Sequence, residues 1–193
     1  MEVRSDNTYT ESITNSGGIY GDIDLFRETS YNRVLEDTWV GCYEGIKRCN
    51  IVLDNIESVQ MDETAKKKYK GEMLFIRALT YFNMVRLWGD VPLVIHYFDD
   101  PFQTFGFGRS PVNDVYEQIK NDLIEASKIL PEAPDSKRLG TAVSGSAKTL
   151  LGKVYLTLKD YDNAVKILKE VIDSKQYTFI QDYTELFDVD NKN

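Results

Sequence analysis

Two groups of side chains in this sequence have the composition of a sugar-binding site. Such sites stack flat aromatic rings on the apolar faces of a sugar and bind its hydroxyls with Asn, Asp or Arg side chains. Tyr31, Asn32 and Arg33 supply this mixture a few residues before Trp39. A later group consists of Tyr97, Phe98, Phe102, Phe105, Phe107 and Arg109. We expect the first four residues to surround one concavity, with at least one aromatic face exposed to solvent.

A structural role is the competing interpretation for both groups. Trp39 begins an apolar helix face, where a tryptophan belongs to the core more often than to a binding site. The later aromatic residues lie in a long connection and can anchor it on the body of the protein. Both interpretations stay open at the level of the sequence.

Catalytic chemistry has few candidates. His96 is the only histidine, and the sequence offers it no nucleophile or metal ligand as a partner. The acidic pairs Glu36-Asp37 and Asp99-Asp100 are adjacent in the chain, so their carboxylates point apart instead of across a cleft. The sequence contains neither a glycine-rich phosphate loop nor a Cys/His metal cluster. It therefore predicts no enzyme, no bound metal and no cofactor.

Two further features are weak candidates for a disulfide and a calcium site. Cys42 and Cys49 lie about 10 Å apart along one predicted helix, which is too far for a disulfide, and two small buried side chains are the simpler interpretation. The segment 188–193 resembles the start of a calcium loop, but Lys192 occupies a ligand position and the turn glycine is missing. We expect neither site.

The composition is that of a folded acidic domain. The chain has 193 residues, a formal net charge of -8 and 42% hydrophobic residues. Binding to nucleic acid or to an anionic lipid surface requires a clustered basic face, which this charge disfavours. No apolar run approaches the roughly 18 residues of a membrane span. The composition therefore argues against nucleic acid as a partner.

The N-terminus allows two interpretations, a cytoplasmic protein or a protein from which an export segment has been removed, and the far end favours the second. Residues 1–21 lack the basic and apolar stretches of a signal peptide, and the chain stops after an apparent turn. We expect both ends to be cuts in a longer protein. Apolar surface near Leu186 and Phe187 should then be left open for the missing part.

Five amphipathic helices follow an irregular N-terminal segment. The apolar spacing predicts helices over 38–57, 62–89, 110–130, 144–158 and 160–173, after an aperiodic polar segment over 1–37. Asp62 is a suitable N-cap for the second helix, Gly89 is suited to end it, and Asp160 should cap the fifth helix. Ser110 followed by Pro111 should open the third helix. The residues 177–180 are a candidate for one short, isolated strand.

The apolar period also predicts which side chains face the core. The expected buried residues are Cys42, Ile46, Cys49, Leu53 and Ile56 in the first helix, Tyr69, Met73, Ile76, Leu79, Phe82 and Val85 in the second, and Val115, Ile119, Leu123, Ala126 and Leu130 in the third. Each set recurs at spacings of three and four residues, as one face of an α-helix does.

The last predicted hairpin fits the tetratricopeptide pattern. This pattern has a Leu-Gly pair, a Tyr three residues later, and in the second helix an Ala followed four residues later by a large apolar residue. The matching residues are Leu151, Gly152, Tyr155, Ala164 and Leu168. Gly152 and Ala164 let the two helices approach closely, whereas Lys148 and Gln176 replace the usual Trp and Pro. The second and third helices resemble the same hairpin opened by an insertion at 89–109.

An ordered series of motifs carries a more specific resemblance. The series consists of Trp39, Tyr43, Ile46 and Asn50, then GEMLFIRALTYF at 71–82, LWGDVPLV at 87–94, RSPVNDVYEQIKNDL at 109–123, and Leu130-Pro131. In this order, the motifs resemble the N-terminal half of SusD/RagB-type proteins. The resemblance covers about residues 39–177.

The resemblance implies a fold, a partner and a location. SusD-like proteins are lipid-anchored on the outer membrane of Bacteroidetes-type bacteria, bind glycans or other nutrients, and cover a SusC-like TonB-dependent transporter without being enzymes. This half is implied to be mainly the scaffold and transporter-docking part, with the lipid anchor expected outside this sequence. Because ligand residues differ within the family, the resemblance transfers no role to the four candidate residues.

We therefore expect one all-α domain over 1–193. It should have an irregular cover over 1–37 and tetratricopeptide-like hairpins over 38–176, stacked in a right-handed superhelix. The expected function is that of a SusD-like glycan- or nutrient-binding protein. The alternative is an intracellular tetratricopeptide adaptor that holds peptides in its concave groove, although such an adaptor has no reason to carry the insertion at 89–109.

Overall fold

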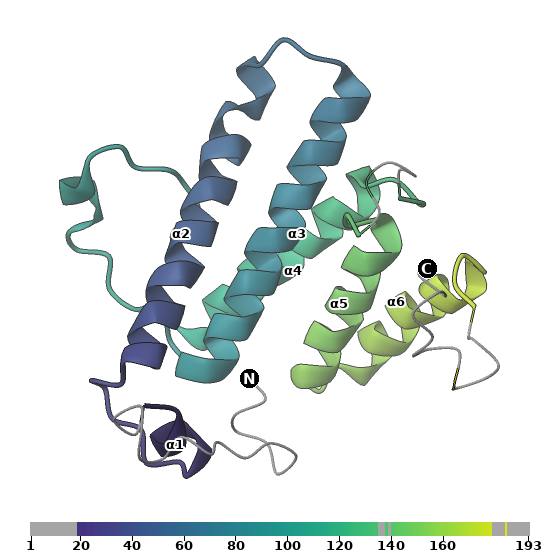
Figure 1. The fold of residues 1–193 in the computed structure, drawn as a ribbon. Helices are drawn as coiled ribbons and strands as arrows, with labels where there is room; N and C mark the ends of the chain where they lie inside the picture. The colour runs from purple at the N-terminus through teal and green to yellow at the C-terminus, as the bar shows by residue number, and fades with distance from the viewer. Residues whose placement is uncertain (1–18, 135–137, 139, 179–183, 185–193) are drawn as a thin grey trace.

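A computed structural model describes residues 19–134, 138, 140–178 and 184, and this part of the chain is all-α (Figure 1). Its helices are α1 Ile19–Asp24, α2 Arg33–Asn55, α3 Glu63–Trp88, α4 Val112–Ile129, α5 Ser144–Thr157 and α6 Tyr161–Asp173, with 3₁₀ turns η2 Ile56–Ser58 and η3 Pro101–Thr104. Within these residues, the one β-type pairing is a bridge between Val91 and Ser110. Helices α2 to α6 pack in sequential pairs, each against the next. The predicted all-α, tetratricopeptide-like fold is confirmed.

Three helix ends form as the sequence predicts. The Asp62 side chain caps α3 by accepting a hydrogen bond from the Ala65 amide at 2.9 Å. Gly89 ends that helix with φ of 69°, a left-handed conformation that glycine adopts without strain. Asp160 caps α6 by accepting from the Asn163 amide at 3.3 Å. These ends depend on local chemistry, which is why the sequence is sufficient to place them.

The N-terminal boundary differs from the prediction. The residues predicted to be irregular up to position 37 include α1 and the first turn of α2, which begins at Arg33. Asn32 caps α2 because its side-chain oxygen accepts a hydrogen bond from the Val34 amide at 3.0 Å. The first turn of α2 buries none of its side chains, so the apolar period could not detect it.

The buried face of α3 is also rotated from the predicted one. Tyr69, Ile76 and Leu79, which were expected in the core, are 38%, 41% and 37% exposed. The buried residues on α3 instead include Leu74, Ala78, Tyr81, Phe82, Met84 and Val85. Helix α3 is covered on two sides, by α2 and by α4, and it carries apolar residues all around. A helix of this kind has no single stripe from which the orientation can be deduced.

Residues distant in the sequence determine where α4 begins. Ser110 and Pro111 were predicted to be the cap and the first helical residue, but α4 begins at Val112, and no side-chain hydrogen bond comes from Pro111. The Val112 amide donates to the Asp90 side chain at 2.9 Å. The Ser110 amide donates to the Val91 carbonyl at 3.0 Å, so the two ends of the connection between α3 and α4 are joined.

The apolar face predicted for the third helix is confirmed, and the face predicted for the first is confirmed in part, because Cys42 and Leu53 are only half-buried. Ile46, Cys49 and Ile56 are buried near α2. All five residues predicted for the third helix are buried as well, namely Val115, Ile119, Leu123, Ala126 and Leu130.

Several smaller predictions can be checked in the same part of the chain. Cys42 and Cys49 are both free thiols, and burial raises the pKa of Cys49 to about 11, so it stays protonated. Among the described helices, none has the length and apolar content needed to cross a membrane. The expectations for Leu186, Phe187 and the segment 188–193 fall outside the described residues, as does half of the candidate strand over 177–180.

The last hairpin has the close helix contact that its sequence predicts. A Cβ atom added to Gly152 of α5 would lie 2.6 Å from Cγ of Leu168 on α6, and Ala164 on α6 is fully buried. The hairpin of α3 and α4 has a similarly close contact between its helices, because a Cβ atom on Gly71 of α3 would lie 2.7 Å from Cγ of Leu130. Small residues therefore set the spacing in both hairpins.

The substitution Gly152→Leu tests this contact. We expect it to lower the free energy of unfolding by about 1–3 kcal/mol, because the larger side chain must displace Leu168. The matched control is Gly41→Leu, since an added Cβ at Gly41 of α2 has no neighbouring atom within 4 Å. Urea unfolding followed by circular dichroism measures both, and equal stabilities for the two variants would contradict the hairpin assignment.

Candidate functional site

The connection between α3 and α4 runs back along α2 and forms one wall of the candidate site (Figure 1). Its first part, residues 91–97, is fixed by side chains of the helices. Tyr81 donates to the Val94 carbonyl at 3.0 Å and accepts from the Val94 amide at 2.8 Å, while Tyr43 donates to the Pro92 carbonyl at 2.8 Å. Burial raises the pKa of Tyr81 to about 12, so its hydroxyl keeps the proton that it donates.

A buried ion pair lies beneath this segment. Arg77 of α3 donates through Nε and Nη2 to the two carboxylate oxygens of Asp122 on α4, at 2.8 and 2.7 Å. The two side chains are only 7% and 3% exposed. Burial disfavours the charge on Arg77, but the hydrogen bonds and the charge of Asp122 outweigh it, so the pKa of Arg77 is raised. Gln118 adds a hydrogen bond to Asp122 at 2.8 Å.

The third nitrogen of this guanidinium binds the connection between α3 and α4. Nη1 of Arg77 donates to the side-chain oxygen of Asn50 at 2.8 Å and to the Ile95 carbonyl at 3.0 Å. The amide nitrogen of Asn50 donates in turn to the carbonyls of Val94 and His96, at 3.0 and 3.2 Å. Three consecutive carbonyls of the connection are thus bound from within the core.

His96 takes part in this anchoring. Its Nδ1 atom lies 3.0 Å from Oδ1 of Asp54 on α2, and the Tyr97 amide donates to Oδ2 of Asp54 at 2.7 Å. Partial burial works against the charge of Asp54, but the bonds from Tyr97 and His96 hold its pKa below the usual value. Asp54 therefore stays ionised and binds the connection at the point where it leaves α2.

An aromatic pocket of about 350 Å³ lies between α2 and the connection. Its lining consists of Trp39, Tyr43, Glu44, Ile46 and Lys47 from α2, and Pro92, Val94, His96, Tyr97, Phe98 and Phe107 from the connection. Aromatic rings come from both walls, and the exposed side chains of Glu44 and Lys47 lie beside them. This combination of apolar faces and polar groups is suited to a sugar, which has both kinds of surface.

The rings of this pocket hold one another in place. Phe98 and Phe107 pack edge to face with centroids 5.4 Å apart. On the opposite wall, Trp39 lies 5.1 Å from Tyr43 and 5.2 Å from Trp88, in tilted and perpendicular arrangements. Trp39 therefore packs against the core through Trp88 and also lines the pocket, and its role in ligand binding stays a prediction.

The structure separates the four residues predicted to surround one concavity. Trp39 lines the aromatic pocket, but the other three do not. Asn32 is buried and caps α2, Tyr31 is 93% exposed, and Arg33 lies 3.6 Å from Asp37 on the helix surface. A role for Tyr31, Asn32 and Arg33 in ligand binding stays a prediction.

The second aromatic group is divided by the structure. Phe98 and Phe107 line the pocket, whereas Phe102 and Phe105, at the tip of the connection, are 70% and 76% exposed. Sequence analysis did not propose Tyr43, although its position four residues after Trp39 places both on one helix face.

In the part of the chain that the structure describes, no group of His, Cys, Asp and Glu side chains could hold a metal.

Comparison with known proteins assigns the family. A sequence profile of SusD-like proteins, described as starch-binding and associating with the outer membrane, matches residues 2–156. The chain belongs to the SusD-like family. A SusD-like protein of Bacteroides ovatus is 30% identical over 185 residues, which cover 87% of this chain and 33% of that protein. SusD-like protein P2 of Formosa agariphila is 29% identical over 160 residues, covering 81% and 31%. The chain thus spans about a third of the length of these SusD-like relatives.

Solved structures of SusD-like proteins have the same architecture. A SusD-like protein of Bacteroides fragilis superposes with a TM-score of 0.88 at 26% identity, covering 98% of this chain and 38% of that one. A laminarin-binding SusD-like protein superposes with a TM-score of 0.81 at 32% identity, covering 93% and 40%. This chain therefore corresponds to one part of a longer SusD-like protein fold.

The ion pair beneath the site is open to a direct test. Asp122→Asn keeps the shape of the side chain but leaves the buried guanidinium of Arg77 without its counter-charge. We expect the free energy of unfolding to fall by about 3–5 kcal/mol. The control is Glu117→Gln, which removes a surface pair with Lys120 and should cost about 0–1 kcal/mol. Urea denaturation measures the free energy of unfolding of both variants. An equally small loss for Asp122→Asn would show that the buried ion pair does not stabilise the packing of α3 on α4.

Proposed function

We propose that this chain is the scaffold and transporter-docking part of a glycan-binding SusD-like protein, and that its aromatic pocket contributes to the glycan site. The observation that carries the proposal is the pairing of aromatic rings from α2 and from the connection in one pocket, with Glu44 and Lys47 beside them. Membership of a family of starch-binding proteins supports a carbohydrate as the ligand. One structural relative is a laminarin-binding SusD-like protein, and the crystal structure of another includes a xylogluco-oligosaccharide.

The proposal includes a cellular setting. The protein acts as a surface lipoprotein of the outer membrane, bound to a SusC-like TonB-dependent transporter, and passes nutrients to it without catalysing a reaction. Family membership supports this setting and disfavours an intracellular peptide adaptor. Co-purification of a TonB-dependent transporter with the full-length protein from outer-membrane extracts tests the partnership, and recovery of the protein without such a transporter would contradict it.

Two phenylalanines of the connection provide a matched test of the glycan site. Phe107 lines the aromatic pocket, whereas Phe102 is exposed at the tip of the same connection. We expect Phe107→Ala in the full-length protein to raise the Kd for its glycan about tenfold, which corresponds to the loss of one stacking contact. Phe102→Ala should leave the Kd unchanged. Calorimetric titration with a panel of oligosaccharides, including laminarin and xyloglucan fragments, measures both.

Trp39→Ala extends the test to the opposite wall of the pocket. It should also weaken binding, and its thermal unfolding must be recorded because Trp39 packs against Trp88. Full glycan affinity in both Phe107→Ala and Trp39→Ala would place the site elsewhere, either near Tyr31, Asn32 and Arg33 or outside this chain. The 193-residue chain alone should bind weakly, because it spans only about a third of its relatives.

A further inference from the structure

His96 is held at three points, yet its ring stays open to solvent in the lining of the aromatic pocket. Its carbonyl accepts from the Asn50 side chain at 3.2 Å, and the next amide, that of Tyr97, donates to Asp54 at 2.7 Å. Its Nδ1 atom lies 3.0 Å from Oδ1 of Asp54. The His96 side chain is nonetheless 68% exposed. The imidazole is therefore fixed in position without being covered.

The contact with Asp54 decides which ring nitrogen carries the proton. Partial burial works against the charge of Asp54, but the bonds from Tyr97 and His96 hold its pKa below the usual value. An ionised carboxylate only accepts hydrogen bonds, so the neutral imidazole has its proton on Nδ1 and a lone pair on Nε2. Among the residues that the structure describes, none forms a hydrogen bond with Nε2.

This nitrogen differs from the other polar groups of the aromatic pocket. The Tyr43 hydroxyl already donates to the Pro92 carbonyl. Glu44 and Lys47 are long, exposed side chains on α2, and ordering such a side chain on a ligand costs conformational entropy. The ring of His96 has lost this freedom before any ligand arrives. It is therefore a pre-organised hydrogen-bond acceptor.

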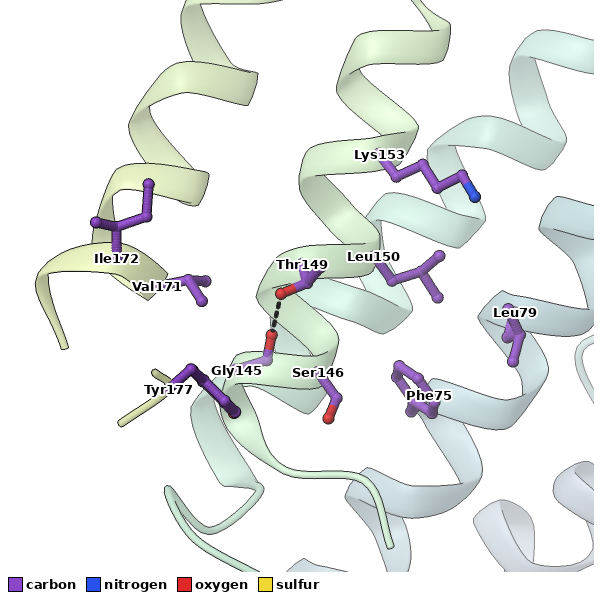
Figure 2. A pocket seen from close by; sticks show the side chains of 10 residues that line it. All are labelled: Phe75, Leu79, Gly145, Ser146, Thr149, Leu150, Lys153, Val171, Ile172 and Tyr177. Carbon is purple, nitrogen blue, oxygen red and sulfur yellow. Dashed lines mark hydrogen bonds between the residues drawn. The ribbon is translucent and has the colours of Figure 1, made fainter. Parts of the chain in front are cut away.

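A second concave surface of the fold has different polar groups. An apolar groove of about 590 Å³ lies between α3, α5 and the end of α6 (Figure 2) and shares no lining residue with the aromatic pocket. Thr149 there donates to the Gly145 carbonyl at 2.7 Å, the bond drawn in Figure 2. The Ser146 hydroxyl accepts from the Val143 amide at 3.3 Å. The groove presents mainly hydrocarbon, so sugar hydroxyls are better matched by the aromatic pocket.

The charges near His96 indicate which sugars suit this pocket. A sugar unit that stacks on an aromatic ring has its hydroxyls around its rim, where they can donate to an acceptor on the pocket wall. The carboxylates of Glu44 and Asp54 outnumber the ammonium of Lys47 in this region. Like charges repel, so a uronic acid or a sulfated sugar is disfavoured there. An uncharged sugar hydroxyl is the matching group.

We propose that Nε2 of His96 accepts a hydrogen bond from a hydroxyl of an uncharged sugar unit in the aromatic pocket. His96 is then a binding residue that selects the ligand, and Asp54 is a positioning residue that fixes the proton on Nδ1 and the orientation of the ring. This inference rests on the proposed glycan site and adds to it the group that reads a hydroxyl.

Two substitutions of His96 separate this role from a purely structural one. The amide of Asn can replace Nδ1 and keep the contact with Asp54, whereas the amide of Gln can replace Nε2 and lose that contact. In the full-length protein, we expect His96→Asn to raise the Kd for the glycan about tenfold, as the loss of one hydrogen bond does. His96→Gln should stay within about threefold of the parent.

Calorimetric titration measures both affinities, and melting curves show that both variants fold. A purely structural role predicts the reverse order, because only His96→Asn keeps the contact with Asp54. Parental affinity in His96→Asn, or a larger loss in His96→Gln, would therefore overturn the inference.

The position of the ring proton can be measured without a ligand. His96 is the only histidine of the chain, so nitrogen NMR of the histidine-labelled 193-residue chain needs no assignment by substitution. At a pH of about 8, where an ordinary imidazole is neutral, we expect the proton on Nδ1 and none on Nε2. A proton on Nε2 would contradict the proposal.

The failure of this inference can be told apart from the failure of the glycan site. Weaker binding in Phe107→Ala and Trp39→Ala, with parental affinity in His96→Asn, would keep the pocket as the site and remove the role of His96. Full affinity in the two ring variants would remove both. Tighter binding of uronic acid fragments than of laminarin fragments would overturn the preference for an uncharged sugar.

Discussion

The buried pair of Arg77 and Asp122 is the interaction on which the rest of this structure depends. It joins α3 to α4 with two short hydrogen bonds, and the same guanidinium reaches Asn50 of α2 and the backbone of the connection. Removing two charges from water is costly, and the cost is offset only when nearly every donor and acceptor is satisfied. Here the donors of Arg77 are divided between a carboxylate, an amide oxygen and a carbonyl. This arrangement therefore specifies one packing of three helices and one path for the connection.

The path of the connection then creates the aromatic pocket. A segment of this length between two helices has many possible positions, and each backbone group that it buries needs a partner. Asn50, Tyr43, Tyr81 and Asp54 supply those partners along the length of α2 and α3. As a result, Phe98 and Phe107 line the same pocket as Trp39. The pocket is a consequence of polar anchoring beneath it, although its own lining is largely aromatic.

The scaffold has two concave surfaces with different chemistry. The aromatic pocket combines rings with exposed charged groups, which suits a ligand with both apolar and hydroxylated faces. The groove between α3, α5 and α6 is lined by aliphatic and aromatic side chains whose polar neighbours are engaged internally. The first surface thus offers rings beside charged groups, whereas the second offers mainly hydrocarbon.

The sequence by itself determined the features that depend on local chemistry. The spacing of apolar residues predicted the helices, Asp62, Gly89 and Asp160 marked their ends, and the small residues at Gly152 and Ala164 identified the hairpin. An ordered series of motifs identified the family. Each of these signals is carried by residues close together in the chain, so each can be recognised without knowing the packing.

Only the tertiary structure decided which surfaces face each other. Helix α3 is apolar all around, so its orientation, and with it the exposure of Ile76 and Leu79, depends on the helices on either side. The start of α4 is set by Asp90, which is far away in sequence. The site is affected most, because Asn32 caps a helix and Trp39 lines one pocket with Phe98 and Phe107. Contacts between residues this distant in sequence form only when the buried hydrogen bonds of Arg77 and Asn50 fix the connection, and no local pattern records that choice.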